Sequence, residues 1–303
     1  MLAFYKNGNY NVMILNDGTK IRQTNDEEFI PDRIESMDIK ITNRCDMGCP
    51  MCHEDSVPDG EHAVLNSDII DSIPEYTELA IGGGNPLEHP QLTNFLMKCR
   101  KKKLICNITV NSKHFIEDYD FIKNLYDNKL IHGIGVSIFS INDDLINKIK
   151  SVNGVCHTIV GMTSIDVMSE MKHKDLKVLV LGYKNFRRGE TFYNSNTNLL
   201  ETKFFHWEMF IKEAIHGNYY TVLSFDNLAL QQLSIKNIIS KNEWDMMFMG
   251  DDGINGALTS GSMYIDLVKK QFAKNSCAAL EERYNCSDFN NDVNKMFSFL
   301  LKK

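Results

Sequence analysis

The chain has 303 residues, 43% of them hydrophobic and 24% charged, which is the composition of a globular protein large enough for one domain and an extension. A formal charge of −7 provides no broad positive field, so nucleic acid and anionic lipid are disfavoured as partners. Residues 1–20 lack the pattern of a secretory signal, and no run of 18 apolar residues occurs, so we expect a cytoplasmic protein without a membrane span.

The first predicted element is a β-hairpin over residues 3–23, with its turn at residues 16–18 (NDG) between two alternating runs. Six strand-like runs follow, separated by helix-like stretches such as 89–103 and 117–129, where apolar residues recur every three or four positions. The strand-like runs are residues 37–42, 78–83, 105–111, 133–139, 156–161 and 177–183. This alternation predicts a parallel sheet in an α/β fold, doubly wound or a whole or partial barrel, with reactive groups at the carboxyl ends of the strands.

The pattern changes near residue 190. Residues 196–215 and 228–240 are predicted to be helical, and residues 220–225 to form a strand. Residues 243–268 are predicted to form two strands around a turn, whose MGDDG stretch (249–253) has the oxygen ligands of a cation site but the composition of a hairpin turn. We therefore divide the chain into an N-terminal hairpin (1–34), a β/α core (35–190) and a C-terminal α+β cap (191–303).

Three of the eight cysteines, Cys45, Cys49 and Cys52, stand in one short loop after the first strand of the core. In a reducing compartment, clustered thiols indicate metal binding rather than disulfides. A structural zinc site needs a fourth ligand, and His53 would point away from its neighbour Cys52 in an extended loop. Three thiolates can instead hold three irons of a [4Fe–4S] cluster and leave the fourth iron open. We therefore favour an iron–sulfur cluster, with zinc as the alternative.

The spacing Cys45-x3-Cys49-x2-Cys52, after the first strand of a β/α series, resembles the signature of the radical S-adenosylmethionine (radical SAM) superfamily. The resemblance implies a partial (β/α)6 TIM-like barrel, with the N-terminal hairpin and the C-terminal α+β extension added to it. It also implies one [4Fe–4S] cluster whose open iron binds the amino and carboxylate groups of SAM. Reductive cleavage of SAM would then yield a 5′-deoxyadenosyl radical that abstracts hydrogen from a substrate, with a reductant such as flavodoxin or ferredoxin as partner.

Four further stretches match the superfamily by position. Residues 82–86 (GGGNP) resemble its Gly-Gly-Glu-Pro segment, in which glycines allow the backbone to approach the ligand closely, although Asn85 stands in place of the glutamate and brings no charge. Residues 109–113, 136–140 and 157–161 resemble the segments that end the next three strands. Met51 stands where the superfamily commonly has an aromatic residue near adenine; simple core packing is the alternative. The resemblance assigns SAM contacts to Met51, Gly82, Gly83, Gly84, Asn85, Asn111 and Ser137.

Two segments are candidates for substrate binding. His53 and Glu54 follow the cysteine cluster, and a solvated or capping role is the alternative for both. Tyr183, Lys184, Arg187 and Arg188 leave the sixth strand at its carboxyl end, where they could bind a carboxylate or phosphate, and an ordinary surface loop is the alternative. The sequence assigns no catalytic side chain.

The remaining cysteines do not indicate a second cluster. Cys99, Cys106 and Cys156 lie in predicted helices or strands and suit a core, while Cys277 and Cys286 are too few for four ligands. Within the radical SAM interpretation we lean toward a peptide or protein side chain as substrate, because the terminal strands offer edges for strand addition. A small metabolite or nucleoside is the alternative substrate. A non-catalytic iron–sulfur redox sensor and a zinc-stabilised binding protein are the alternative functions.

Overall fold

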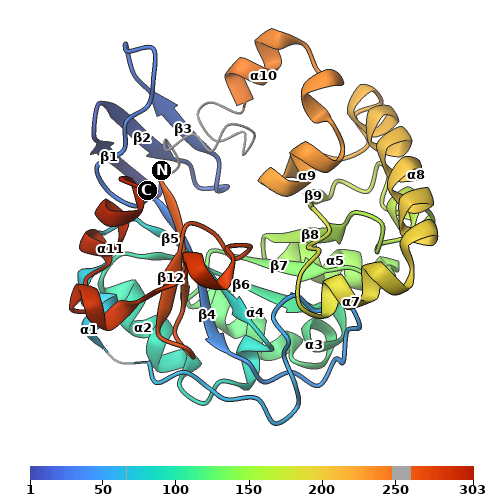
Figure 1. Cartoon of the computed structure of the whole chain (residues 1–303). Helices are drawn as coiled ribbons and strands as arrows, with labels where there is room; N and C mark the ends of the chain where they lie inside the picture. The colour runs from blue at the N-terminus through green and yellow to red at the C-terminus, as the bar shows by residue number, and fades with distance from the viewer. Residues whose placement is uncertain (66, 248–260) are drawn as a thin grey trace.

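The computed structural model describes residues 1–65, 67–247 and 261–303 of the chain (Figure 1). It begins with a three-stranded antiparallel sheet made of β1 (Ala3–Asn7), β2 (Tyr10–Ile14) and β3 (Lys20–Gln23). The predicted single hairpin over residues 3–23 was therefore incomplete, because a first turn lies at Gly8. Gly8 has a φ of +52°, and a Cβ there would lie 1.7 Å from the carbonyl oxygen of Ile30. Only glycine fits this turn.

The main sheet has ten strands in the order β10-β9-β8-β7-β6-β5-β4-β11-β12-β13. Strands β10 through β4, and β11 beside β4, are parallel, whereas β12 and β13 are antiparallel. Their bounds are β4 Ser36–Thr42, β5 Glu78–Gly83, β6 Ile105–Asn111, β7 Gly133–Ser137, β8 Gly154–Ile159, β9 Lys177–Leu181, β10 Val222–Phe225, β11 Ser262–Asp266, β12 Gln271–Ala273 and β13 Tyr284–Asn285. All six predicted core strands and the predicted strand at 220–225 are confirmed. Within the described residues no pairing joins β10 to β13, so the barrel is partial, as predicted.

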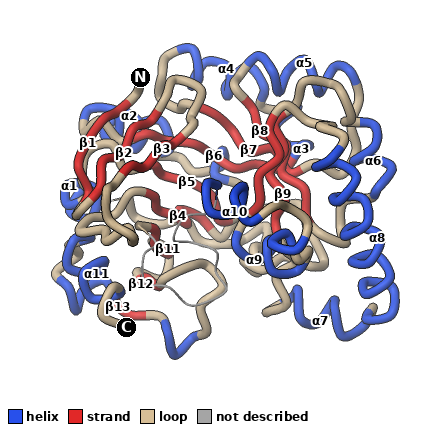
Figure 2. Tube along the Cα trace, turned by 90° about the horizontal axis from the view of Figure 1, so that it is seen from above, coloured by secondary structure: helices blue, strands red, loops and turns tan. Residues whose placement is uncertain are grey.

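Helices cover the outer face of the curved sheet, as Figure 2 shows for α4, α5, α6 and α8 outside β7 to β9. The helices are α1 Ser67–Ser72, α2 Leu92–Lys101, α3 Ser112–Glu117, α4 Tyr119–Asp127, α5 Asp143–Ser151, α6 Ile165–Glu170, α7 Arg188–Ser195, α8 Thr197–His216, α9 Asn227–Gln232, α10 Lys241–Met247 and α11 Val293–Leu300. In the described part of the chain, none is long and apolar enough to cross a membrane.

The alternation of β4 separates two environments. Met37, Ile39 and Ile41 are buried in the core between the sheet and its helices. Because successive side chains of a strand point to opposite faces, Asp38 and Lys40 lie on the inner face. The inner face of the sheet therefore carries charge at its centre.

The region after residue 190 differs from its prediction in two ways. Residues 241–247 form α10, so the first of the two strands predicted in 243–268 is wrong. Trp244 is buried while Met246 and Met247 are exposed, which is a helical rather than an alternating pattern. The second strand is present as β11, but it lies between β4, with which it pairs in parallel, and β12, with which it pairs antiparallel, instead of pairing with the residues before it. The MGDDG stretch at 249–253 lies outside the described residues.

The N-terminal sheet is fastened to the main sheet by one buried carboxylate. Glu35 is fully buried, and its oxygens accept hydrogen bonds from Asn7 Nδ2 at 2.9 Å, from the Tyr10 hydroxyl and from Arg22 Nη2 at 2.8 Å. Burial favours a higher pKa for Glu35, but Arg22 and Lys20, with the hydroxyl of Tyr10, outweigh it and lower the pKa below its ordinary value. Glu35 is therefore ionised at neutral pH.

Replacing Glu35 with glutamine is expected to lower the free energy of unfolding by about 2–4 kcal/mol, because it removes the buried charge that pairs with Arg22 and Lys20. The native pKa is depressed, so the stabilisation is present above the ordinary carboxyl pKa of 4.5 and is lost as the pH falls below it. Urea denaturation at neutral pH and at about pH 4 checks this. Glu75→Gln, at an exposed ion pair with Lys103, is the control and should change little. Equal effects of the two substitutions would refute the fastening role.

Candidate functional site

The three clustered cysteines lie in a loop, residues 43–57, that leaves β4 at its carboxyl end and closes on itself. We call it the cysteine loop. The amide of Cys45 donates to the Val57 carbonyl at 2.9 Å, and the amide of Val57 donates to the Asn43 carbonyl at 3.0 Å. A further backbone bond from the Cys52 amide to the Cys49 carbonyl, at 3.2 Å, tightens the turn between the last two cysteines. The predicted ligands therefore sit in one closed loop at the carboxyl edge of the sheet.

The three thiols of the cysteine loop are half-buried and lie within electrostatic range of one another. Burial raises the pKa of Cys45, and Cys52 adds to the increase. Burial likewise raises the pKa of Cys49, with further increases from Cys52 and Cys45. Gathered thiolates of this kind repel one another unless a soft metal centre compensates their charge. The donor set therefore fits an iron–sulfur cluster, and Cys45, Cys49 and Cys52 are the residues that would hold it.

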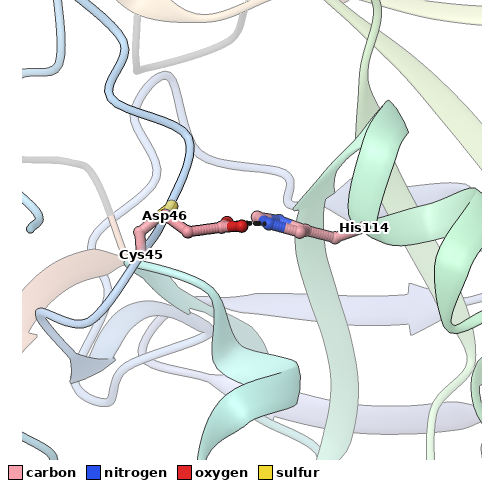
Figure 3. A group of neighbouring side chains, drawn as sticks. All are labelled: Cys45, Asp46 and His114. Atoms are coloured by element: carbon pink, nitrogen blue, oxygen red, sulfur yellow. Dashed lines mark hydrogen bonds and ion pairs between the residues drawn. The ribbon is translucent and has the colours of Figure 1, made fainter. Parts of the chain in front are cut away.

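One side of the cysteine loop is anchored to α3 through Asp46. Figure 3 shows the Asp46 side chain directed at His114, with Cys45 beside it on the loop. Asp46 Oδ1 accepts from His114 Nε2 at 2.6 Å, and Oδ2 lies 2.8 Å from Lys113 Nζ. The hydrogen bonds from Lys113 and His114 lower the pKa of Asp46 to about 2. The ligand atoms of Cys45, Asp46 and His114 lie within 4.8 Å of one another. Both oxygens of the Asp46 carboxylate, however, already contact side chains of α3. We interpret this group as an anchor.

The other side of the cysteine loop is held by the two arginines at the start of α7. Arg187 Nη1 donates to the His53 carbonyl oxygen at 2.7 Å, and Arg188 Nη2 donates to the Ser56 carbonyl oxygen at 2.6 Å. Arg187 adopts a φ of +55°, an unfavourable backbone conformation for a side chain of this kind. Both predicted substrate-binding arginines thus contact the loop backbone, and their contact with substrate stays a prediction.

The three glycines that end β5 have different roles. Gly83 has a φ of +109°, and a Cβ there would lie 2.4 Å from the Thr42 carbonyl oxygen. A Cβ on Gly84 would lie 2.1 Å from the Arg44 carbonyl oxygen. These two glycines let β5 approach the cysteine loop. A Cβ on Gly82, by contrast, would meet no atom of the described residues within 4 Å. Gly82 therefore borders open space, and its contact with SAM stays a prediction.

The glycines give a matched pair of substitutions. Gly83→Ala is expected to cost about 1–3 kcal/mol or more of folding free energy, because it combines a left-handed φ with a backbone clash. Gly82→Ala should leave the free energy of unfolding within about 1 kcal/mol and weaken SAM binding, because its methyl group enters open space. Urea denaturation and SAM titration of both variants check this. Similar loss of stability in both would refute the assignment.

The two asparagines assigned to SAM act as helix caps here. Asn85 is buried, and its Oδ1 accepts from the Leu87 amide at 3.2 Å. Asn111 Oδ1 accepts from the Lys113 amide at 2.8 Å at the start of α3. Ser137 ends β7 and is half-buried, and the Met51 side chain is also half-buried. The SAM contacts of these four residues stay predictions.

A buried ionic network lies beneath the cysteine loop. Lys40 Nζ lies 2.7 Å from Glu54 Oε2 and 3.2 Å from the Glu54 carbonyl oxygen. His53 Nε2 lies 3.3 Å from Glu54 Oε1, and burial together with Lys184 lowers the pKa of His53 to about 4. Glu54 thus ties the loop to Lys40 on the inner face of β4. Its substrate contact, like that of His53, stays a prediction.

Tyr183 is buried, and its hydroxyl donates to the Gly189 carbonyl oxygen at 2.7 Å. This contact packs the loop after β9 and directs the hydroxyl away from solvent; a substrate contact stays a prediction. Sequence reasoning overlooked Asp38 and Lys40. Their spacing was the available signal, because two charges at alternate positions of an otherwise apolar strand lie on the same face of it. A strand whose two faces are both covered is expected to carry no charge on either face.

Comparisons with known proteins agree with this geometry. The family model described as the radical SAM superfamily matches residues 39–179. The tungsten-containing aldehyde ferredoxin oxidoreductase cofactor-modifying protein of Pyrococcus furiosus is 22% identical over 144 residues, which cover 45% of this chain and 38% of that protein.

Two crystal structures of Streptococcus suis SuiB resemble the fold. SuiB bound to precursor peptide SuiA gives a TM-score of 0.57 at 13% identity, covering 88% of this chain and 65% of SuiB. SuiB bound to S-adenosylmethionine gives a TM-score of 0.53 at 14% identity, covering 88% and 64%. The chain thus spans less than two thirds of each of these relatives.

Proposed function

We propose that this protein is an enzyme that cleaves SAM reductively and uses the resulting radical to abstract hydrogen from a substrate, because residues 39–179 match the family model of the radical SAM superfamily. The observation that carries the proposal is the gathering of three thiols in one anchored loop at the carboxyl edge of the sheet. Cys45, Cys49 and Cys52 would hold three irons of a [4Fe–4S] cluster and leave the fourth iron open to SAM, and the cluster would supply the electron for cleavage when bound and reduced.

The chain's own residues position this chemistry. Asp46 and the two arginines of α7 fix the cysteine loop from opposite sides, and Gly82 leaves room at the end of β5 for the ligand. A primary carbon radical abstracts hydrogen from almost any nearby C–H group, so the substrate must be held closely and water kept out. We propose that the inner face of the sheet, closed by the region after residue 190, holds the substrate.

We propose a peptide or protein side chain as the substrate. SuiB, whose fold this chain shares, was crystallised with a precursor peptide, and the outer edge of β1 is free among the described residues for strand addition. The Pyrococcus relative is named for modifying a cofactor, which favours a small molecule as the second candidate. A flavodoxin or ferredoxin is the proposed source of electrons.

Anaerobic reconstitution tests the proposal. We expect a brown protein with about four irons per chain that forms 5′-deoxyadenosine from SAM when a strong reductant is added. A fully loaded cluster that neither changes its spectrum on addition of SAM nor cleaves it would favour the sensor function. A colourless protein that contains zinc would refute both.

A further inference from the structure

The inner face of the sheet borders a space that is open to water and yet enclosed by protein. The Asp38 side chain is exposed, but burial raises its pKa. Cys277, in the segment after β12, is exposed as well, and burial likewise raises the pKa of its thiol. A side chain is exposed to water and yet has its pKa raised by burial when it lines a water-accessible space that protein surrounds. Lys184 links their surroundings by contact: its Nζ lies 3.0 Å from Oγ of Ser276, the residue before Cys277, and 3.2 Å from Nε2 of His53. The His53 ring lies 3.3 Å from Glu54, which pairs at 2.7 Å with Lys40 on the same face of β4 as Asp38.

The Asp38 carboxylate is available to a ligand. It forms no hydrogen bond or ion pair with any residue that the structure describes. Its neighbour in β5 is Ala80, which is exposed and small, and two positions further along β5 Gly82 borders open space. The chain therefore presents a carboxylate in the middle of the inner face and leaves room in front of it.

Lys184 is available in the same way. Its Nζ lies 3.2 Å from His53 Nε2 and 3.0 Å from Ser276 Oγ, which are both neutral partners. No carboxylate of the described residues lies within 4.0 Å of it. An ammonium group has three protons to donate, so these two contacts leave one donor free and the charge without a paired carboxylate.

The other charged groups of this region already have partners. Glu54 lies 2.7 Å from Lys40 and 3.7 Å from Arg187, and Asp266 lies 4.0 Å from Lys40. Asp226 Oδ1 accepts from two backbone amides, at 2.9 and 2.7 Å. Asp38 and Lys184 remain as one acid and one base that share a space but are too far apart to pair.

We propose that Asp38 and Lys184 bind a zwitterionic part of the substrate, with a cationic nitrogen at Asp38 and a carboxylate at Lys184. The inference rests on the proposed function, because it takes this space to be the substrate site. A ligand with a single charge would leave the opposite protein charge uncompensated in an enclosed space, which is unfavourable. An amino acid meets the requirement with its own termini, and a peptide meets it with a basic and an acidic side chain.

Alkylation of Cys277 by iodoacetamide tests the proposal on the cluster-loaded protein. The rate is measured anaerobically at alkaline pH and read at Cys277 by peptide mass spectrometry. The probes are free L-lysine and the blocked dipeptide N-acetyl-Lys-Glu-amide. Each is compared with one analogue in which every amine is acetylated and with another in which the carboxylate is replaced by an amide. We expect one of the two charged probes to slow alkylation, and the neutralised analogues to need about tenfold higher concentration, since each lost ion pair costs on the order of 1.4 kcal/mol.

Variants identify the groups responsible. In Asp38→Asn, the probe with a free amine should protect Cys277 no better than its acetylated analogue. In Lys184→Gln, the probe with a free carboxylate should protect Cys277 no better than its amide. Asp144→Asn and Lys148→Gln, an exposed pair on α5, should change neither. Protection by free lysine alone identifies an amino acid, and protection by the dipeptide alone a peptide segment.

The proposal is overturned if neither probe protects at tens of millimolar, or if neutral analogues protect equally well. These comparisons use the unsubstituted protein, so they hold even if a variant fails to fold. Formation of 5′-deoxyadenosine by the unsubstituted protein without any probe tests the proposed function separately. If 5′-deoxyadenosine is not formed but the charged probes still protect Cys277, the proposed function is refuted and the proposed binding site is supported.

Discussion

Replacing Cys49 with alanine should reduce bound iron from about four atoms per chain to well below one and abolish 5′-deoxyadenosine formation. Cys49 is the middle ligand of the cysteine loop, and its thiol interacts with both Cys45 and Cys52. Two thiolates cannot replace three, because each holds a separate iron of the cluster. Iron analysis, the visible spectrum and product chromatography after anaerobic reconstitution measure the effect.

The matched control removes a thiol far from the loop. Cys156 lies in β8, facing the helices, and burial raises its pKa to about 12, which makes it an inert core side chain. Cys156→Ala should therefore keep its iron and its product. Iron retained by the Cys49 variant, or lost equally by both, would contradict the ligand assignment.

Replacing Lys40 with methionine is expected to lower the free energy of unfolding by about 3–5 kcal/mol, because it leaves Glu54 buried without its closest cation. The side chains of Lys40 and Glu54 are only 4% and 8% exposed, so water cannot compensate the loss. Chemical denaturation under reducing conditions measures it. The cysteine loop should also loosen, since Lys40 bonds the carbonyl oxygen of Glu54 as well.

The double variant separates charge from packing. Lys40→Met combined with Glu54→Leu should recover the part of the loss that comes from Glu54, because an apolar pair can replace a buried ion pair of similar volume. The buried Asp266, 4.0 Å from Lys40, stays without its cation in both variants. Lys123→Met, at an exposed pair on α4, is the control and should cost no more than about 0.5 kcal/mol. A double variant no more stable than Lys40→Met alone would show that packing, not the unpaired charge, determines the cost.

Much of the fold could be predicted because its signals are local. Each core strand is a short apolar run between turns, and the three ligands stand within eight residues of one loop, so no distant contact was needed to find them. The third N-terminal strand was also within reach, since Asn7-Gly8 is a recognised turn sequence. It was overlooked because the NDG turn at residues 16–18 already explained the alternating pattern of residues 3–23 as a single hairpin.

The rest depends on contacts between distant segments. Residues 243–247 (EWDMM) begin with alternating acidic and apolar side chains, so their sequence fits a strand as well as a helix until Trp244 packs into the core. The parallel pairing of β11 with β4 and the approach of Asp38 to Lys184 join segments that share no local pattern. Tertiary packing alone decides such contacts.

The position of β11 has a consequence for biosynthesis. Strand β4 is made early, but its second neighbour, β11, begins only at Ser262. Until the ribosome has released that segment, one edge of β4 keeps its amides and carbonyls unpaired. A nascent chain of this kind is open to intermolecular pairing, and closing so long a loop slows folding. Slower translation or lower growth temperature should therefore change the yield of intact protein, mainly by changing how long this edge of β4 stays unpaired.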